Sequence, residues 1–122
     1  MKVLDSSAIL AFLQDEPGAA PVESALESGA VCGAANWSEV AQKVLAAGKD
    51  WDLVRALVLS YPLVIEPVTG EDAERAARVW RRGAGLSLGD RLCLALADRL
   101  AVEVLTADAA WGSDDRITQI RG

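Results

Sequence analysis

Short apolar runs alternate along the chain with longer segments whose apolar residues recur every three or four positions. The short runs are typical of buried strands, and the longer segments are typical of helices that bury one face. Since parallel strands need long crossover connections, this alternation predicts an α/β fold with a mostly parallel sheet covered on both faces. Strands are expected at residues 2–4, 30–33, 63–68, 102–106 and 116–120, and helices at residues 8–14, 21–28, 36–47, 51–60, 70–82 and 87–101.

Capping residues mark where several of these helices begin. Ser6 and Ser7 are expected to cap the first helix, and Asn36 is expected to begin the third. Thr69 and Asp72 have the spacing of a capping box for the helix that follows them. Each of these side chains can satisfy a backbone N–H group that the first turn of a helix leaves without a partner.

The length of 122 residues predicts a single domain, residues 1–122, with enough chain to bury a core. Apolar residues make up 52% of the chain but aromatic residues only 5%, which favours helices packed on a sheet. The apolar runs are short and interrupted by charge, so no membrane segment is expected. Met1 and Lys2 lead straight into a strand-like run without a targeting signal, so a cytoplasmic protein is expected.

The chain has no histidine and two cysteines, Cys32 and Cys93. The lack of histidine excludes Ser-His and Cys-His catalysis, histidine general bases and the usual zinc sites. The cysteines lie among small or apolar neighbours and far apart in sequence, so we interpret them as buried free thiols. Any chemistry must therefore use carboxylates, hydroxyls or bound ions.

The formal net charge of -6 argues against a protein that holds nucleic acid on a broad basic surface. A nuclease is still compatible with this charge, because divalent cations would reverse the sign of an acidic pocket. A cationic protein partner fits the charge equally well. Five arginines could add a local cationic rim: Arg75, Arg78, Arg81, Arg82 and Arg91.

Four acidic residues stand where an apolar run meets a polar junction: Asp5, Glu39, Asp90 and Asp108. Asp5 and Asp108 follow predicted strands, and the other two lie in the first turns of predicted helices. All four can therefore face one crevice beyond the carboxyl ends of the strands. Clustered carboxylates repel one another, and Mg²⁺ or Mn²⁺ would relieve that repulsion with oxygen ligands alone.

Each acid also has a purely structural interpretation. Asp5 could cap the first helix and Asp108 a later turn, while Glu39 and Asp90 each occupy the third position of a possible capping box. For any one residue the cap is the better interpretation. Four caps need share no location, however, so the predicted convergence favours a metal site.

Four motifs occur in order across almost the whole chain: VLDSSAILAFL, NWSEVAQKV, LSLGDRLCLALA and VLTADAAW. In this order they resemble the PIN-domain ribonucleases, and among them the VapC-type toxins of bacterial toxin–antitoxin pairs. The resemblance implies a three-layer α/β/α domain with a short, mostly parallel sheet. It also implies an endoribonuclease dependent on Mg²⁺ or Mn²⁺, with Asp5, Glu39, Asp90 and Asp108 at the family's four acidic positions.

The resemblance leads to a hypothesis of metal-assisted phosphodiester hydrolysis in RNA. Asp5, Asp90 and Asp108 would hold the metal, and Glu39 would ligate or orient the attacking water. The resemblance implies in-line attack that leaves a 5′-phosphate and a 3′-hydroxyl, and single-stranded or looped RNA is the expected target. It further implies a homodimer and a cognate antitoxin, whose basic segment could place an arginine in the acidic pocket.

Three polar neighbours are candidates for supporting the acids. Ser6 and Thr106 could each hydrogen-bond a ligating carboxylate or a bound water, but Ser6 could equally be an N-cap and Thr106 an ordinary strand residue. Asn36 could orient Glu39 or only cap its helix. The four tryptophans are expected to pack rather than to stack on bases: Trp37, Trp51, Trp80 and Trp111.

Two other classes of protein stay open. An inactive PIN-like binding module would use the acids only to recruit a basic partner, although the presence of all four carboxylates argues against it. A phosphoacceptor receiver domain has a similar length and also gathers acids at strand ends. That class needs an adjacent acidic pair and a lysine near the last strand, whereas the lysines here are Lys2, Lys43 and Lys49.

Overall fold

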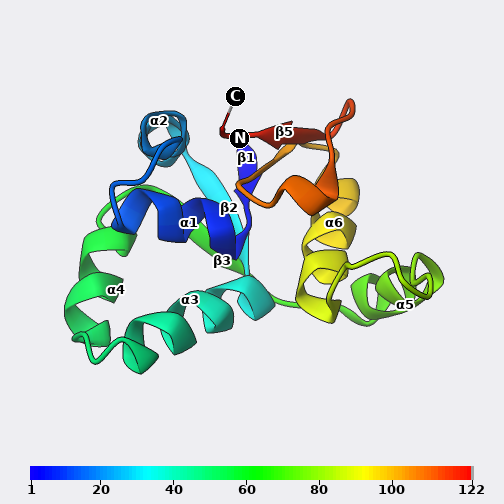
Figure 1. Cartoon of the computed structure of the whole chain (residues 1–122), viewed down its shortest axis with the longest axis horizontal. Coiled ribbons are helices and arrows are strands. Elements are labelled where there is room, and N and C mark those ends of the chain that lie inside the picture. The colour runs from blue at the N-terminus through cyan, green and yellow to red at the C-terminus, as the bar shows by residue number, and fades with distance from the viewer. Residues whose placement is uncertain (122) are drawn as a thin grey trace.

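Five parallel strands form the middle layer of the structure, a computed structural model in which residues 1–121 are described. Their order across the sheet is β3-β2-β1-β4-β5, and all paired neighbours are parallel. Because they run the same way, their carboxyl ends meet at one end of the sheet, with β1 in the centre (Figure 1). The strands are β1 (Lys2–Leu4), β2 (Ala30–Gly33), β3 (Leu63–Glu66), β4 (Val104–Thr106) and β5 (Ile117–Gln119).

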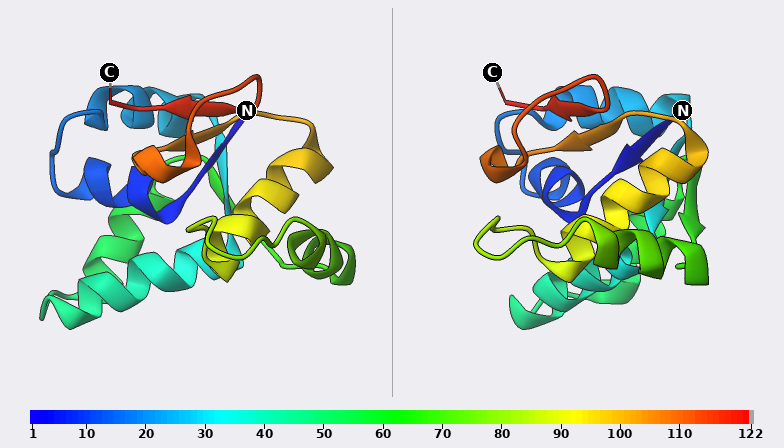
Figure 2. Two further views of the ribbon diagram at one scale, coloured as in Figure 1. Left: turned by 45° about the vertical axis from the view of Figure 1, so that its right-hand side comes forward. Right: turned by 90° about the vertical axis from the view of Figure 1, so that its right-hand side faces the viewer.

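Helices cover both faces of this sheet, which confirms the predicted three-layer α/β/α fold (Figures 1 and 2). A short 3₁₀ helix, η1 (Ala109–Trp111), connects β4 to β5. On one side lie α1 (Ser6–Leu13), α2 (Ala19–Ser28), α3 (Ala34–Ala46) and α4 (Trp51–Leu59). On the other side lie α5 (Gly70–Arg78) and α6 (Leu88–Leu100).

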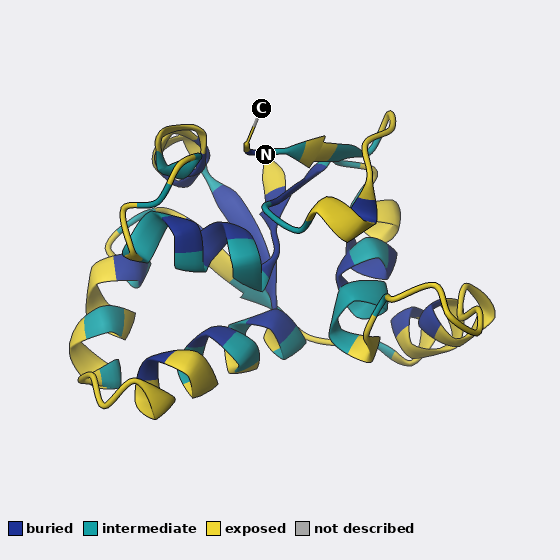
Figure 3. Ribbon diagram, viewed as in Figure 1, coloured by how far each residue is buried: buried dark blue, intermediate teal, exposed yellow. Residues whose placement is uncertain are grey.

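Successive residues of the central strands face opposite layers of the core. Leu4 and Leu105 pack with residues of α1 to α4, whereas Val3 and Val104 pack with residues of α6. Figure 3 shows that these central strands are buried along most of their length. Burial of each such side chain contributes about 1.5–3 kcal/mol. The core therefore holds the ends of β1 and β4 in place, and with them the residues that follow.

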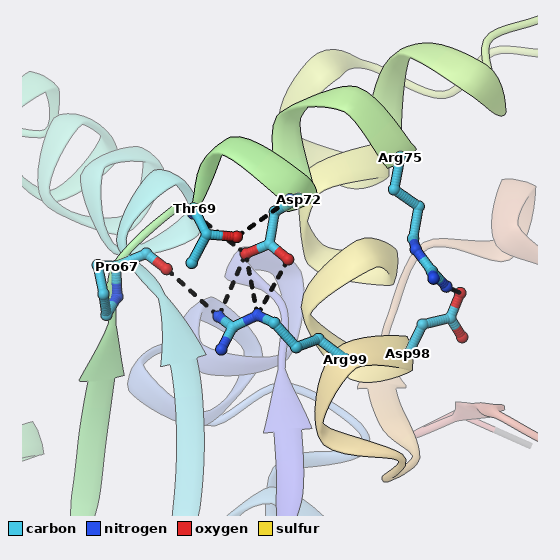
Figure 4. A network of polar contacts seen from close by, with 6 residues as sticks. All are labelled: Pro67, Thr69, Asp72, Arg75, Asp98 and Arg99. Carbon is cyan, nitrogen blue, oxygen red and sulfur yellow. Dashed lines mark hydrogen bonds and ion pairs between the residues drawn. The ribbon is translucent and has the colours of Figure 1, made fainter.

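Ion pairs join α5 to α6 (Figure 4). The Asp72 carboxylate accepts hydrogen bonds from Arg99 Nε at 3.0 Å and Arg99 Nη2 at 3.2 Å, and Arg75 Nη1 lies 3.2 Å from Asp98 Oδ2. Thr69 and Asp72 form the predicted capping box at the start of α5. The Asp72 side chain thus supports its own helix and the contact with its neighbour.

Of the caps predicted for the first helix, the structure has Asp5 and neither of the two serines. Asp5, rather than Ser6 or Ser7, is the N-cap of α1, and its carboxylate accepts the Ala8 N–H at 2.8 Å. Asp5 comes directly after β1 and has extended backbone angles, so its side chain can reach the third N–H of the helix. The two serines belong to the first turn itself.

Two other helix ends also differ from prediction. α3 begins at Ala34, not at Asn36, because Gly33 passes directly from the strand into the helix; Asn36 therefore lies inside the first turn. α5 ends at Arg78, which leaves the segment 79–87 outside any helix. Within residues 1–121, no helix has the length and apolarity needed to cross a bilayer.

Three of the four tryptophans pack as expected. Trp37 and Trp51 meet edge to face with ring centroids 5.1 Å apart, and Trp111 is buried in the turn after β4. The expectation for Trp80 is wrong: 54% of it is exposed. Because α5 ends before Trp80, this side chain has no helical apolar face to join.

Candidate active site at the carboxyl ends of the strands

Asp5 follows the central strand, β1, at the end of the sheet where the carboxyl ends of the strands meet. It is buried there, with only 3% of the residue exposed. Two hydroxyls donate to its carboxylate, Ser7 Oγ at 2.7 Å from Oδ1 and Thr106 Oγ1 at 2.6 Å from Oδ2. Ser7 Oγ also accepts the Ala107 N–H at 2.9 Å, and Thr106 Oγ1 accepts the Asp108 N–H at 3.0 Å. Since each hydroxyl has one proton to donate, both are oriented toward Asp5. The ends of β1 and β4 are thus joined through this carboxylate.

Burial raises the pKa of Asp5 to about 6, because the charged carboxylate loses its contact with water. Hydrogen bonds from Thr106, Ala8 and Ser7 lower this pKa, and the negative charge of Asp90 raises it. The ion pairs found within residues 1–121 do not include Asp5. A buried carboxylate in this state gains stability from a proton or a bound cation.

Glu39 lies in α3, where Asn36 holds its carboxylate. Asn36 Nδ2 donates to Glu39 Oε1 at 2.8 Å and also contacts the carbonyl oxygen of Gly89 at 3.4 Å. A Cβ atom at Gly89 would lie 2.9 Å from Glu39 Oε2, so a larger residue there would displace the carboxylate. Glu39 is thereby placed against the residue that precedes Asp90 in α6.

Asp90 lies in the first turn of α6, in a capping box with Ser87. Its Oδ2 accepts the Ser87 N–H at 2.9 Å, and Ser87 Oγ accepts the Asp90 N–H at 3.1 Å. Burial raises the pKa of the Cys93 thiol well above its usual value, and the charges of Asp5, Asp90 and Glu39 raise it further. The negative charges of three of the four acids therefore act on the same buried thiol.

Asp108 follows β4 and turns its side chain toward η1. Its Oδ1 accepts the Ala110 N–H at 2.9 Å, which caps this short helix, and its carbonyl oxygen accepts from Gln119 Nε2 at 2.9 Å. The backbone of Asp108 is bound by the Thr106 hydroxyl. Asp108 is therefore connected to Asp5 through Thr106 and not through its own carboxylate.

The serine that contacts Asp5 is Ser7, which the sequence reasoning did not select. Ser6 forms no hydrogen bond with the four acids in the part of the chain that the structure describes. A serine two residues after an N-cap aspartate can fold back onto the cap, and this spacing is the signal that could have identified Ser7. Thr106 and Asn36 do contact acids, Asp5 and Glu39 respectively.

The candidate ligands are all oxygen atoms, which suits a hard divalent cation. Both cysteines are buried free thiols, as predicted. Within residues 1–121, no three carboxylate or thiol side chains form a ready-made metal cluster. Asp90 and Asp108 each use one oxygen in a backbone cap, so each has a second oxygen for a cation. The donor set fits such an ion, which would have to draw these carboxylates together.

Comparison of the chain with known protein families gives one match. A sequence model described as PIN domain matches residues 2–113. A search of curated proteins gave no match. Several solved structures are similar in fold, with identities too low to show more than the fold.

A toxin–antitoxin complex from Klebsiella pneumoniae is 17% identical, with a TM-score of 0.78 and 98% coverage of each chain. DNA-bound VapBC from Salmonella typhimurium is 17% identical, with a TM-score of 0.72 and 98% coverage of each chain. VapC20 from Mycobacterium tuberculosis, a toxin that cleaves the sarcin–ricin loop, is 14% identical with a TM-score of 0.71. That comparison covers 94% of this chain and 98% of VapC20.

Proposed function

Because the chain belongs to the PIN-domain family, we propose that it is a metal-dependent endoribonuclease that acts in the cytoplasm as the toxin of a toxin–antitoxin pair. The observation that carries this proposal is the Asp5 carboxylate. It is buried between two hydroxyls, forms no ion pair within residues 1–121, and is affected by the charge of Asp90. A fold that buries an uncompensated carboxylate beside other acids is suited to a cation that neutralises them.

Mg²⁺ or Mn²⁺ would be held by Asp5, Asp90 and Asp108, with Glu39 as a further ligand or as the group that orients the attacking water. When bound, such an ion lowers the pKa of a water molecule and shields the negative charge of the scissile phosphate. Hydrolysis would break the bond between phosphorus and O3′, leaving a 5′-phosphate and a 3′-hydroxyl. The lack of histidine in the chain is consistent with a reaction that needs no histidine base.

The remaining polar residues of the site would fix the acids. Ser7 and Thr106 hold both oxygens of Asp5, so this carboxylate has one orientation and its charge is partly stabilised before any ligand arrives. Asn36 holds one oxygen of Glu39 and leaves the other free of protein donors among the described residues. Gly89 provides the space in which the Glu39 carboxylate sits.

The decisive experiment is cleavage of single-stranded RNA with Mg²⁺ or Mn²⁺, with and without a chelator. We expect cleavage that the chelator abolishes and that Asp5→Asn reduces strongly. Asp115→Asn is the matched control, since Asp115 is an exposed loop acid of the same charge. Cleavage that survives both chelation and Asp5→Asn would exclude the proposed chemistry. No cleavage of varied RNAs would favour a binding module that has lost its activity.

An antitoxin is the proposed protein partner, and the acidic site suggests how it would act. An arginine from a basic segment of that partner could form the bidentate ion pair that the carboxylates lack inside this chain. We also propose a homodimer, as the family resemblance implies. Sedimentation of the purified chain, alone and with the product of a neighbouring reading frame, tests both assemblies.

A further inference from the structure

The segment 79–87 between α5 and α6 exposes an aromatic side chain. Trp80 is 54% exposed and Val79 is 46% exposed, so two neighbouring apolar side chains lie largely in solvent. Among residues 1–121, Trp80 is the only tryptophan whose side chain is largely exposed to solvent. Its exposure leaves the indole ring available to a ligand.

Both ends of the segment 79–87 are attached to the body of the protein. The Trp80 N–H donates to the Ala77 carbonyl at 3.2 Å, and Leu86 packs against the apolar cluster that contains Cys93 and Trp111. The Ser87 N–H donates to Asp90, so the segment ends at a carboxylate of the candidate active site. In the right-hand view of Figure 2 the segment projects on the side toward which the strands point.

Two glycines shape this projection. Gly83 and Gly85 have φ angles of +76° and +78°, in the left-handed region that favours glycine. No atom lies within 4 Å of a Cβ built at either position, so close packing is not the reason for a glycine there. The chain turns at these points while the side chains before them stay in solvent.

The segment also carries positive charge that the protein does not use. Arg75 pairs with Asp98 and Arg78 lies 3.8 Å from Glu74, but the described residues provide no ion-pair partner for Arg81 or Arg82. Both of these arginines are exposed. In a chain with a net charge of -6, these two adjacent arginines give the segment a local positive charge, which attracts anions.

We propose that the segment 79–87 is an RNA-binding element beside the acidic site. Trp80 stacks on an unpaired base, and Arg81 and Arg82 contact phosphates, so that the strand continues from this segment toward Asp90. The proposal rests on the endoribonuclease function proposed above and adds the residues that position its substrate.

The combination of groups favours single-stranded RNA over a protein. An exposed aromatic ring next to free arginines matches the alternating bases and phosphates of a nucleic-acid strand, and every base offers a face for stacking. In a duplex the bases are already stacked on one another, so Trp80 would gain little there. An apolar protein partner would leave the two guanidinium groups without counter-charges.

The test measures binding without cleavage. In an Asp5→Asn background with chelator present, the probe is a fluorescein-labelled oligouridylate of about a dozen nucleotides, a length within the range of single-strand binding sites. We expect Trp80→Ala to weaken binding about 10-fold and Trp80→Phe to restore most of it, because phenylalanine still stacks. A duplex probe of the same length should be insensitive to Trp80→Ala.

The arginines are tested by the salt dependence of the same binding. Replacing both Arg81 and Arg82 with alanine should reduce the slope of log K against log salt by about 1.4, since each contact with a single strand contributes about 0.7. Arg55→Ala is the matched control, because Arg55 is an exposed arginine on α4. An equal effect of Arg55→Ala would overturn the assignment to this segment.

An unchanged affinity of Trp80→Ala for the single strand would overturn the proposal. If such a variant also no longer self-associates in sedimentation, Trp80 belongs to a contact between two copies of the chain instead. Failure of the proposed function looks different. If the parent chain never cleaves RNA but its RNA binding depends on Trp80, only the catalytic proposal fails. If the parent chain cleaves RNA and the Trp80→Ala variant has the same KM, only the proposal of a binding element fails.

Discussion

Asp5 and Asp72 are two buried carboxylates that the fold treats in opposite ways. They are 3% and 4% exposed, and both cap the first turn of a helix. Burial raises the pKa of Asp72, but the hydrogen bonds from Arg99 and Thr69 together bring it below its usual value. Asp5 receives hydrogen bonds from hydroxyl and N–H groups only, and its pKa is raised to about 6.

These two residues differ in whether the fold places a cationic side chain beside the carboxylate. Asp72 has its counter-charge in Arg99 and completes the contact between α5 and α6 (Figure 4). Asp5 has none in the described chain, so its negative charge is stabilised by hydrogen bonds alone until a ligand supplies a counter-charge. Both carboxylates therefore cap a helix and are buried. Only Asp72, the structural one, has a counter-charge within the fold, and Asp5 is the candidate functional one.

The largest expected effect is on activity. Asp5→Asn should reduce RNA cleavage on the order of 1000-fold, more than the roughly 10- to 100-fold typical of losing a residue that only supports a metal ligand. Asp72→Asn removes an equally buried charge and should leave the kcat of the folded enzyme unchanged. Single-turnover cleavage at saturating enzyme measures both. Equal losses in the two variants would remove the distinction between the sites.

The second effect is on stability as a function of pH. A folded pKa of about 6, against 3.8 in the unfolded chain, corresponds to about 3 kcal/mol. Because the folded pKa is the higher one, this contribution is complete below pH 3.8 and is lost as the pH rises through about 6. Urea unfolding with chelator should show this loss in the parent and not in Asp5→Asn. Parallel pH curves for the two proteins would contradict the prediction.

The third effect is on the stability of the α5–α6 contact. Asp72→Asn leaves Arg99 without its partner and should lower the free energy of unfolding by about 2 kcal/mol, less than for fully buried pairs because Arg99 is partly exposed. Glu74→Gln is the control, since the exposed pair with Arg78 contributes well under about 1 kcal/mol. Chemical denaturation at neutral pH compares the two, and similar losses would count against a special role for Asp72.

The smallest effect separates the two neighbouring serines. Ser7→Ala removes a hydrogen bond to Asp5 and should reduce cleavage about 10-fold, whereas Ser6→Ala should have no effect. Cleavage rates of the two variants under identical Mg²⁺ concentrations provide the comparison. Should Ser6→Ala be the slower enzyme, the geometry around Asp5 would need revision.

Much of the fold was predictable because its signals are local. The capping boxes at Thr69 and Ser87 depend on residues three positions apart, and the strand observed at residues 63–66 falls within the apolar run predicted as a strand at residues 63–68. The start of α3 at Ala34 was missed because Gly33 begins that helix without a side-chain cap.

The surroundings of the candidate site were less predictable. The sequence placed four acids at junctions between elements, and in the structure the charges of Asp5, Glu39 and Asp90 all raise the pKa of the buried Cys93 thiol. It did not show that Asp108 turns toward η1, because that orientation depends on a backbone N–H within the next turn. Nor did it show that Trp80 is exposed, since this follows from where α5 stops packing against α6.

The order of apolar and polar positions was enough to determine the α/β architecture, since strand and helix periodicity and capping depend on near neighbours in the chain. The chemical state of Asp5 was decided only by tertiary structure. Its hydroxyl partners Ser7 and Thr106 lie 99 residues apart in the sequence, and its burial results from packing on both faces of the sheet. A pKa depends on the distances to all surrounding charges and dipoles, and folding alone sets those distances.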